Sequence, residues 1–187
     1  MASLMTHAFA AVALGKTLTA VKLPPRFLAL AVVSSLLPDA DVVGFALGVE
    51  YGDLLGHRGL SHSLMFALVW SFGAMSLVGF QNIARGSRTW WKLAVLLFTV
   101  TASHGVLDAL TNGGLGIAFF APFDGTRYFF PWRPVVVSPI SFELFFTGWG
   151  GAVLQSELKF IWLPLLALWL AVARTRKTLR GRRGKSN

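Results

Sequence analysis

Long apolar stretches separated by short polar or proline-containing turns dominate the chain. They fall at about residues 4–21, 27–48, 60–83, 93–110 and 160–173, with a less regular one at 140–156. From Gly59 to Ala84, 26 residues pass without a Lys, Arg, Asp or Glu, and an α-helix needs roughly 20 residues to cross a bilayer. The pattern predicts an all-α, multi-pass transmembrane helix bundle of about four to six helices, some short or tilted.

Proline and glycine mark the breaks in this pattern. Pro24 and Pro25 separate the first two helices, Pro38 interrupts the second, and Pro164 lies inside the last apolar run, where neighbouring helices can tolerate it. Gly, Pro and aromatic residues dominate 111–140, which predicts an irregular outward loop region. We expect one membrane-embedded domain over residues 1–173, followed by a basic tail over residues 174–187.

Composition agrees with membrane insertion. The chain is 55% hydrophobic and 13% charged, with a mean hydropathy of +0.62, whereas soluble domains are nearer a quarter charged. A net charge of +9 could suggest nucleic-acid binding, but seven of the basic residues lie between Arg174 and Lys185, directly after an apolar run. Such a tail is typical of a cytoplasmic anchor on anionic lipid, so we expect no nucleic-acid partner. Without cysteine, disulfides and thiolate metal ligands are excluded.

The charges also predict an orientation. A path that crosses the membrane at each apolar run places thirteen basic residues on one side and four on the other, the four being Arg58, Arg127, Arg133 and Lys159. All eight acidic residues fall on the same side of the membrane as these four basic residues. The side rich in Lys and Arg is normally cytoplasmic. We therefore expect a cytoplasmic C-terminus and an acidic end that faces outward.

All four histidines and three aspartates fall at or near the outer ends of the predicted helices. These residues are His7, Asp39, Asp41, His57, His62, His104 and Asp108. His104 and Asp108 are four residues apart, so they share a helix face. A single His on an apolar helix is commonly a packing residue, and an Asp after Pro often caps a turn. Ionisable residues at membrane depth are expensive, however, and imidazoles with carboxylates suit a divalent metal of the zinc or manganese type.

The remaining polar residues at the outer end have two interpretations each. The guanidinium groups of Arg58, Arg127 and Arg133 suit recognition of phosphate or carboxylate, or they pair with acids and anchor at the interface. The aromatic residues near them form an interfacial belt or a lid over the site; they are Phe119, Phe120, Phe123, Tyr128, Phe129, Phe130 and Trp132. Glu143 is a helix-start residue or a further ligand, whereas Glu50 and Asp53 are expected to be solvated.

Four blocks of sequence resemble a known family. They are Thr6-His7, Leu37-Pro38-Asp39-Ala40-Asp41, the stretch from Gly56 to Ser63, and the stretch from Ser103 to Thr111; the segments at 122–127, 131–134 and 138–139 resemble its longer members. The family is the YdjM family of bacterial and archaeal inner-membrane proteins, to which metal-dependent hydrolysis is ascribed. It is remotely similar to the all-helical zinc-dependent phospholipase C fold, whose His-x-x-x-Asp motif is matched by His104 and Asp108. Val42 and Val43 depart from the family pattern, in which a polar residue follows the Asp-x-Asp block.

The resemblance and the charged residues together imply a membrane-bound metal-dependent hydrolase, phospholipase- or phosphatase-like, in the bacterial or archaeal cytoplasmic membrane. Its substrate would be a phosphoester or ester bond of a membrane lipid at the outer face, and its cofactor about one to three zinc ions. The seven His and Asp residues are the expected ligands. Asp41 and Arg58 are the catalytic candidates, and Arg58, Arg127 and Arg133 the substrate-binding ones. The alternative is a non-enzymatic metal-stabilised scaffold or regulatory binding protein, and bis-histidine haem binding is a weaker one. The sequence does not determine the oligomeric state.

The predicted orientation can be measured with topology reporters. A reporter fused after Asn187 should score as cytoplasmic, and a tag inserted in the 48–54 segment should react with a reagent that does not cross the membrane. A C-terminus found outside would turn the histidine-containing end toward the cytoplasm and would overturn the outer-face substrate.

Overall fold

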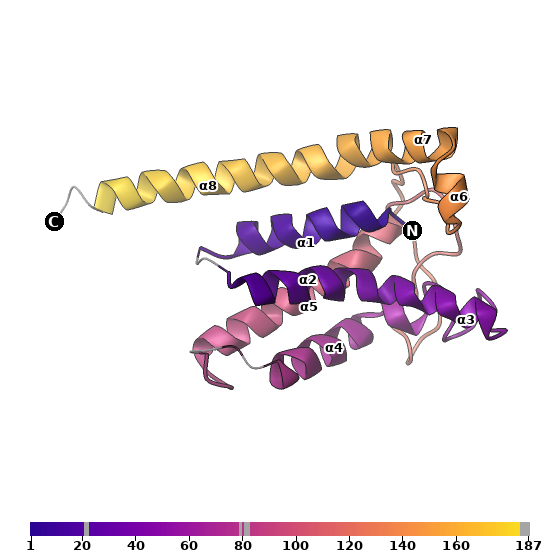
Figure 1. The fold of residues 1–187 in the computed structure, drawn as a ribbon, viewed down its shortest axis with the longest axis horizontal. Helices are drawn as coiled ribbons and strands as arrows, with labels where there is room; N and C mark the ends of the chain where they lie inside the picture. Colours follow the sequence, from indigo (N-terminus) through magenta and orange to yellow (C-terminus); the bar gives the residue numbers. More distant parts are fainter. Residues whose placement is uncertain (21–22, 79, 81–82, 184–187) are drawn as a thin grey trace.

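The computed structural model describes residues 1–20, 23–78, 80 and 83–183, and these form helices joined by irregular segments (Figure 1). The α-helices are α1 (Leu4–Leu18), α2 (Pro25–Leu36), α3 (Val43–Ala46), α4 (Leu64–Leu77), α5 (Arg88–Ala109), α6 (Phe142–Phe145), α7 (Gly148–Glu157) and α8 (Leu163–Arg183). Two 3₁₀ turns, η1 (Leu37–Val42) and η2 (Leu60–His62), and a π-helical turn, η3 (Leu158–Trp162), complete them. Within the described residues there is no strand, only two isolated bridges inside 111–135. The predicted all-α bundle is confirmed.

Three continuous helical stretches are long and apolar enough to cross a membrane. They are Pro25–Ala46, Arg88–Ala109 and Gly148–Leu179, and α1 and α4 are shorter apolar helices. These three candidate spans and two shorter apolar helices agree with the apolar runs of the sequence, and residues 111–140 contain no helix.

The bundle core lies between α1, α2, α4 and α5. Phe27, Met75 and Leu97 are buried there, and small residues such as Ala11 and Ala94, both fully buried, allow the helices to approach closely. The α7–η3–α8 stretch lies beside α1 at the edge of the bundle (Figure 1). Most of its side chains point away from the rest of the protein, as expected for a lipid-facing helix.

The last helix is more continuous than the sequence suggests. The runs at 140–156 and 160–173 are joined by η3, and helix continues from Gly148 to Arg183. Pro164 lacks an N–H and would clash with the carbonyl four residues before it. The chain widens into a π turn just before this proline, and the Leu163 N–H donates to the Leu158 carbonyl instead. The predicted basic tail therefore begins as part of a helix, and residues 184–187 lie outside the described residues.

The two ends of the bundle carry opposite charge. The α1–α2 turn, the α4–α5 connection and the C-terminal part of α8 lie at one end (Figure 1), and these segments carry most of the basic residues of the sequence. Lys22 and Lys185 belong to the same predicted set but lie outside the described residues. All eight carboxylates belong to segments at the opposite end. Which end faces the cytoplasm stays a prediction.

Candidate metal centre

All seven His and Asp residues singled out from the sequence meet in one cluster at the acidic end. His7 comes from α1, Asp39 and Asp41 from η1, His57 from the loop after α3, His62 from η2, and His104 and Asp108 from α5. Six of the seven are buried, and Asp41 is partly buried. We call these seven residues the His/Asp cluster.

Local backbone features aim these side chains. On α5, His104 and Asp108 are one turn apart, and both are fully buried. Pro38 cannot donate to the helical ladder, and the chain tightens there into η1. A 3₁₀ turn has three residues per turn, so Asp39 and Asp41 point in different directions. Asp39 faces His104 with a separation of 3.3 Å between its Oδ1 and Nε2, whereas Asp41 faces His57.

The loop that carries His57 is closed by glycines. A Cβ on Gly56 would lie 2.1 Å from the Glu50 carbonyl oxygen, and one on Gly59 would lie 2.3 Å from that of Leu54. Between them, Arg58 has a φ of 65°, a left-handed conformation that is unfavourable for a side chain of this size. The surrounding contacts must stabilise this conformation.

Four residues of the cluster have the geometry of a mononuclear site. One ligand atom from each of Asp39, His62, His104 and Asp108 lies within 4.8 Å of the others. His62 Nε2 is 3.0 Å from His104 Nε2, 3.5 Å from Asp39 Oδ1 and 3.8 Å from Asp108 Oδ2. Nitrogen and oxygen ligands about 2.1 Å from one zinc ion are about 3.4 Å apart in a tetrahedron. The observed separations therefore fit one small divalent cation.

The hydrogen bonds of His62 and His104 indicate where a cation could bind. His104 Nδ1 lies 2.7 Å from the Ser35 carbonyl oxygen, which can only accept, so in a neutral His104 ring the lone pair lies on Nε2. His62 Nδ1 faces Asp41 Oδ2 at 3.1 Å, and its Nε2 points at His104 Nε2. A proton or a metal ion between the two nitrogens satisfies this geometry.

A proton alone leaves much of the cluster unsatisfied. Both carboxylate oxygens of Asp39, Asp108 Oδ2 and both ring nitrogens of His7 are buried without a hydrogen-bond partner among the described residues. Leaving such groups unpaired costs about 1–3 kcal/mol each, and more for charged ones. His7 stacks on His104 with ring centroids 3.7 Å apart, and its Nε2 lies 3.3 Å from Asp108 Oδ1. His7 is therefore placed as an additional ligand or as a partner of Asp108.

Asp41 is occupied by its neighbours. It accepts hydrogen bonds from the Arg58 backbone N–H at 3.2 Å and from the Ser61 hydroxyl at 2.5 Å. Its Oδ1 lies 2.7 Å from His57 Nδ1. With His57 and His62 it forms a second group with ligand spacing. A second ion bound to Asp41 would have to replace these hydrogen bonds. If Asp41 instead accepts hydrogen bonds from the Nδ1–H groups of His57 and His62, the Nε2 atoms of both rings stay free to bind a metal.

The Arg58 guanidinium is directed inward. It is fully buried, with its Nη1 donating to the Gly113 carbonyl at 2.7 Å and its Nη2 to Thr111 Oγ1 at 3.0 Å. Its Nε lies 3.3 Å from Asp108 Oδ2. These contacts hold the Asp108 carboxylate from the side opposite His7. The side chain therefore contacts protein groups at each of its three nitrogens.

The other two outer arginines differ from each other. Arg127 donates to the carbonyls of His57, Tyr51 and Asp53 at 3.0–3.1 Å, which ties the irregular 111–140 region to the His57 loop. Arg133 is exposed, and its guanidinium lies 4.6 Å from the centroid of the Phe129 ring. Arg133 is thus the outer arginine whose hydrogen-bond donors face solvent or headgroups.

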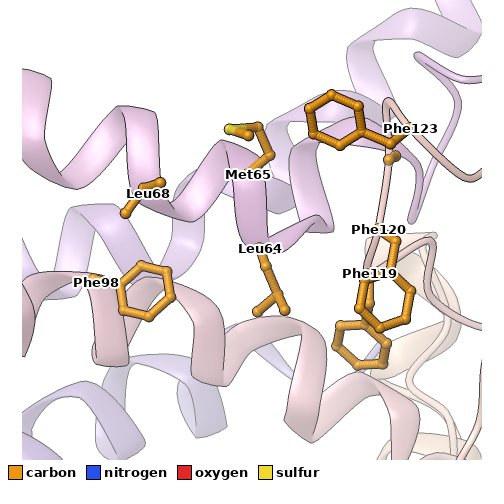
Figure 2. Close-up of a pocket in the computed structure, with 8 residues that line it drawn as sticks. Leu64, Met65, Leu68, Phe98, Phe119, Phe120 and Phe123 are labelled. Atoms are coloured by element: carbon orange, nitrogen blue, oxygen red, sulfur yellow. The ribbon is translucent and has the colours of Figure 1, made fainter.

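An apolar groove of about 370 Å³ lies between α4 and α5 beside the cluster. Figure 2 shows Leu64 and Leu68 of α4 across from Phe98 of α5, with three phenylalanines of the 119–123 segment at one end. The Leu64 N–H donates to the Phe119 carbonyl at 3.0 Å. Leu64 follows His62 by two residues, so this end of the groove adjoins the cluster.

Some participants received no individual role from the sequence. Ser61 donates a hydrogen bond to Asp41, and Thr111 accepts one from Arg58. Both lie inside the sequence blocks that resemble the YdjM family, and this was the only indication of their importance in the sequence. No sequence signal indicated a role for buried Glu157, whose Oε2 accepts a hydrogen bond from the Ser3 hydroxyl at 2.6 Å and so joins the end of α7 to the start of α1. Glu143 is exposed in the first turn of α6, outside the cluster.

The fold and this cluster define a helical membrane protein with a buried group of histidines and aspartates that could hold a metal ion. The chain belongs to the YdjM family, since the family model described as YdjM inner membrane protein matches residues 1–179. It is 37% identical over 169 residues to the inner membrane protein YbcI of Escherichia coli (strain K12), covering 90% of this chain and 95% of that protein. No solved structure matches the chain. The resemblance drawn from the four sequence blocks is confirmed, and the family agrees with an inner-membrane location.

Removing a central ligand should remove the metal. We expect Asp39→Asn and His104→Ala to insert normally but to lose at least tenfold in metal content, measured by elemental analysis of purified protein. Asp124→Asn, which neutralises an exposed carboxylate at the same end, should retain wild-type metal. Stoichiometric metal in both cluster variants would exclude Asp39 and His104 from the ligand set.

Close packing at Gly105 should also be required. A Cβ there would lie 2.9 Å from the His62 carbonyl oxygen and 3.2 Å from the Phe119 ring, so Gly105→Ala should push η2 away from α5 and destabilise the protein by about 1–3 kcal/mol. In Gly73→Ala, where a Cβ meets nothing within 4 Å, helix propensity should increase stability by up to about 1 kcal/mol. Thermal unfolding of both variants checks this, and equal behaviour would contradict the close contact.

Proposed function

We propose that this protein is a membrane-bound metal-dependent hydrolase that acts on a phosphoester or ester bond of a membrane lipid at the outer face. The observation that carries the proposal is the buried Asp39 carboxylate, which has no hydrogen-bond partner among the described residues and faces two imidazole nitrogens only 3.0 Å apart. A structural core would avoid such an arrangement, whereas a metal site requires it.

The chain's own residues would hold one divalent ion through Asp39, His62, His104 and Asp108, with His7 beside them. Mixed imidazole and carboxylate ligands favour zinc among the common divalent ions, with manganese as the second choice. When bound, such an ion polarises a phosphoryl or carbonyl oxygen and activates water as a nucleophile.

Two residues expected from sequence to be catalytic have positioning roles in this proposal. Asp41 orients His57 and His62 through their Nδ1 atoms and is held in turn by the Ser61 hydroxyl. Arg58 holds Asp108 in place and neutralises part of the buried negative charge. Phosphate contact, expected for Arg58 from the sequence, is instead assigned to Arg133, since Arg58 has no exposed donor.

A lipid substrate is supported by the groove beside the cluster. All of its lining residues are apolar, and they belong to α4, α5 and the aromatic 119–123 segment (Figure 2). An acyl chain can lie in such a groove while its ester or phosphate end reaches the adjoining cluster, whereas a soluble polar substrate would gain nothing from it.

Activity should depend on metal and on Arg133. Purified protein should hydrolyse a phospholipid in a substrate screen, lose this activity with a chelator and regain it with zinc. Arg133→Gln should keep its metal and lose about tenfold in kcat/KM, mainly through KM, because one charge-assisted hydrogen bond is worth about 1.5–3 kcal/mol. The matched control is Lys159→Gln, since Lys159 also lies over a ring, that of Phe160, and is exposed; it should be unchanged.

A non-enzymatic metal-stabilised scaffold is the second candidate, and the burial of the cluster favours it. Asp39, the most exposed of the four central residues, is only 5% exposed. A structural site has a closed set of ligands, whereas a catalytic one keeps a position open. If metal-loaded protein hydrolyses no lipid, ester or phosphoester, and metal removal unfolds it, the scaffold is the correct function.

A further inference from the structure

A second groove lies at the basic end, far from the His/Asp cluster. It has a volume of about 770 Å³ and runs between the C-terminal end of α1 and the N-terminal half of α5. Cavities of roughly 300–1,000 Å³ are the usual size for ligand sites. From α5 it is lined among others by Arg88, Trp91, Lys92 and Val95, and from α1 by Leu18.

The polarity of this groove changes along its length. Arg88 and Lys92, one helical turn apart, line the part of the groove nearest the start of α5 and are exposed. Neither side chain forms a hydrogen bond or ion pair with the described part of the chain. Every acidic residue belongs to a segment at the opposite end of the bundle. Farther along α5 the lining becomes apolar at Val95, which is 54% exposed.

The direction of this gradient matches one leaflet of a bilayer. Arg88 and Thr99, at the two ends of the α5 wall, are eleven residues apart, about 16 Å along a helix, and half of the hydrocarbon core is about 15 Å. Trp91, 51% exposed at the groove, has the amphipathic ring that is enriched at the headgroup level. Cations therefore lie where phosphates lie, and apolar side chains lie where acyl chains lie.

We infer that this groove binds one anionic phospholipid, with its phosphate on Arg88 and Lys92 and an acyl chain along Leu18 and Val95. Basic pockets between transmembrane helices commonly hold anionic headgroups. A soluble anion would use the two cations but leave the apolar wall exposed, and a zwitterionic lipid would place its own cation against them. The inference does not depend on the metal centre or on hydrolysis.

The test is lipid binding to the full-length protein, measured by native mass spectrometry in detergent with phosphatidylglycerol and phosphatidylcholine of identical chains. Wild type should retain one phosphatidylglycerol in preference to phosphatidylcholine. Arg88→Gln with Lys92→Gln should weaken that binding about tenfold or more, since each cation near lipid phosphate contributes roughly a factor of five. The matched control is Arg174→Gln with Lys177→Gln, which removes the same charge from exposed positions of α8 and should leave binding unchanged.

A third variant distinguishes the contribution of the apolar wall to lipid binding from that of the two cations. Val95→Trp fills the apolar part and keeps both cations, so it too should lose the bound lipid. Inorganic phosphate or glycerol phosphate should compete only weakly with phosphatidylglycerol. Equal losses of phosphatidylglycerol binding in the α5 and α8 double variants would show that general electrostatic attraction explains the binding. Full binding by Val95→Trp, or strong competition by phosphate, would show a simple anion site. Either result overturns the inference.

Discussion

The burial of two carboxylates inside a helical membrane protein is the constraint on which the rest of the structure depends. Asp39 and Asp108 are almost fully removed from solvent, and a buried charge is tolerated only where positive charge or donors surround it. Arg58, three imidazoles and the Ala2 backbone N–H, which donates to Asp108 Oδ1, supply part of this. The facing nitrogens of His62 and His104, 3.0 Å apart, lie where a metal ion could be held.

Distant segments converge because each has to bring one group to that centre. The 3₁₀ turn at Pro38 separates Asp39 from Asp41 in direction, so one carboxylate enters the central site and the other orients histidines. Gly105 allows η2 to approach α5, and the left-handed backbone at Arg58 turns its guanidinium inward to Asp108. The strain at Arg58 is local, and it is offset by an ion pair and two hydrogen bonds in a medium where these are strong.

Outside the cluster, the two ends of the helix bundle differ in charge and in the grooves they carry. The carboxylates and the apolar groove that adjoins His62 lie at one end, and most of the described cations and the groove beside Lys92 lie at the other. Since apolar helices connect the two ends, the two grooves lie at opposite ends of the bundle. One end therefore suits lipid chemistry, whereas the other suits retention of an anionic lipid.

The sequence by itself determined the helix bundle, the charge asymmetry and the identity of the seven cluster residues. Apolar runs and membrane energetics depend on local composition, and His104 and Asp108 share a face through helix periodicity alone. Only the tertiary structure decided the roles. Whether Asp41 is a ligand or an orienting carboxylate depends on its contacts with Ser61 and His57, and Arg58 turned inward because of a backbone conformation that no residue spacing predicts. The same holds for Glu157, whose partner Ser3 is 154 positions away, because side-chain contacts between distant segments follow from packing and not from sequence periodicity.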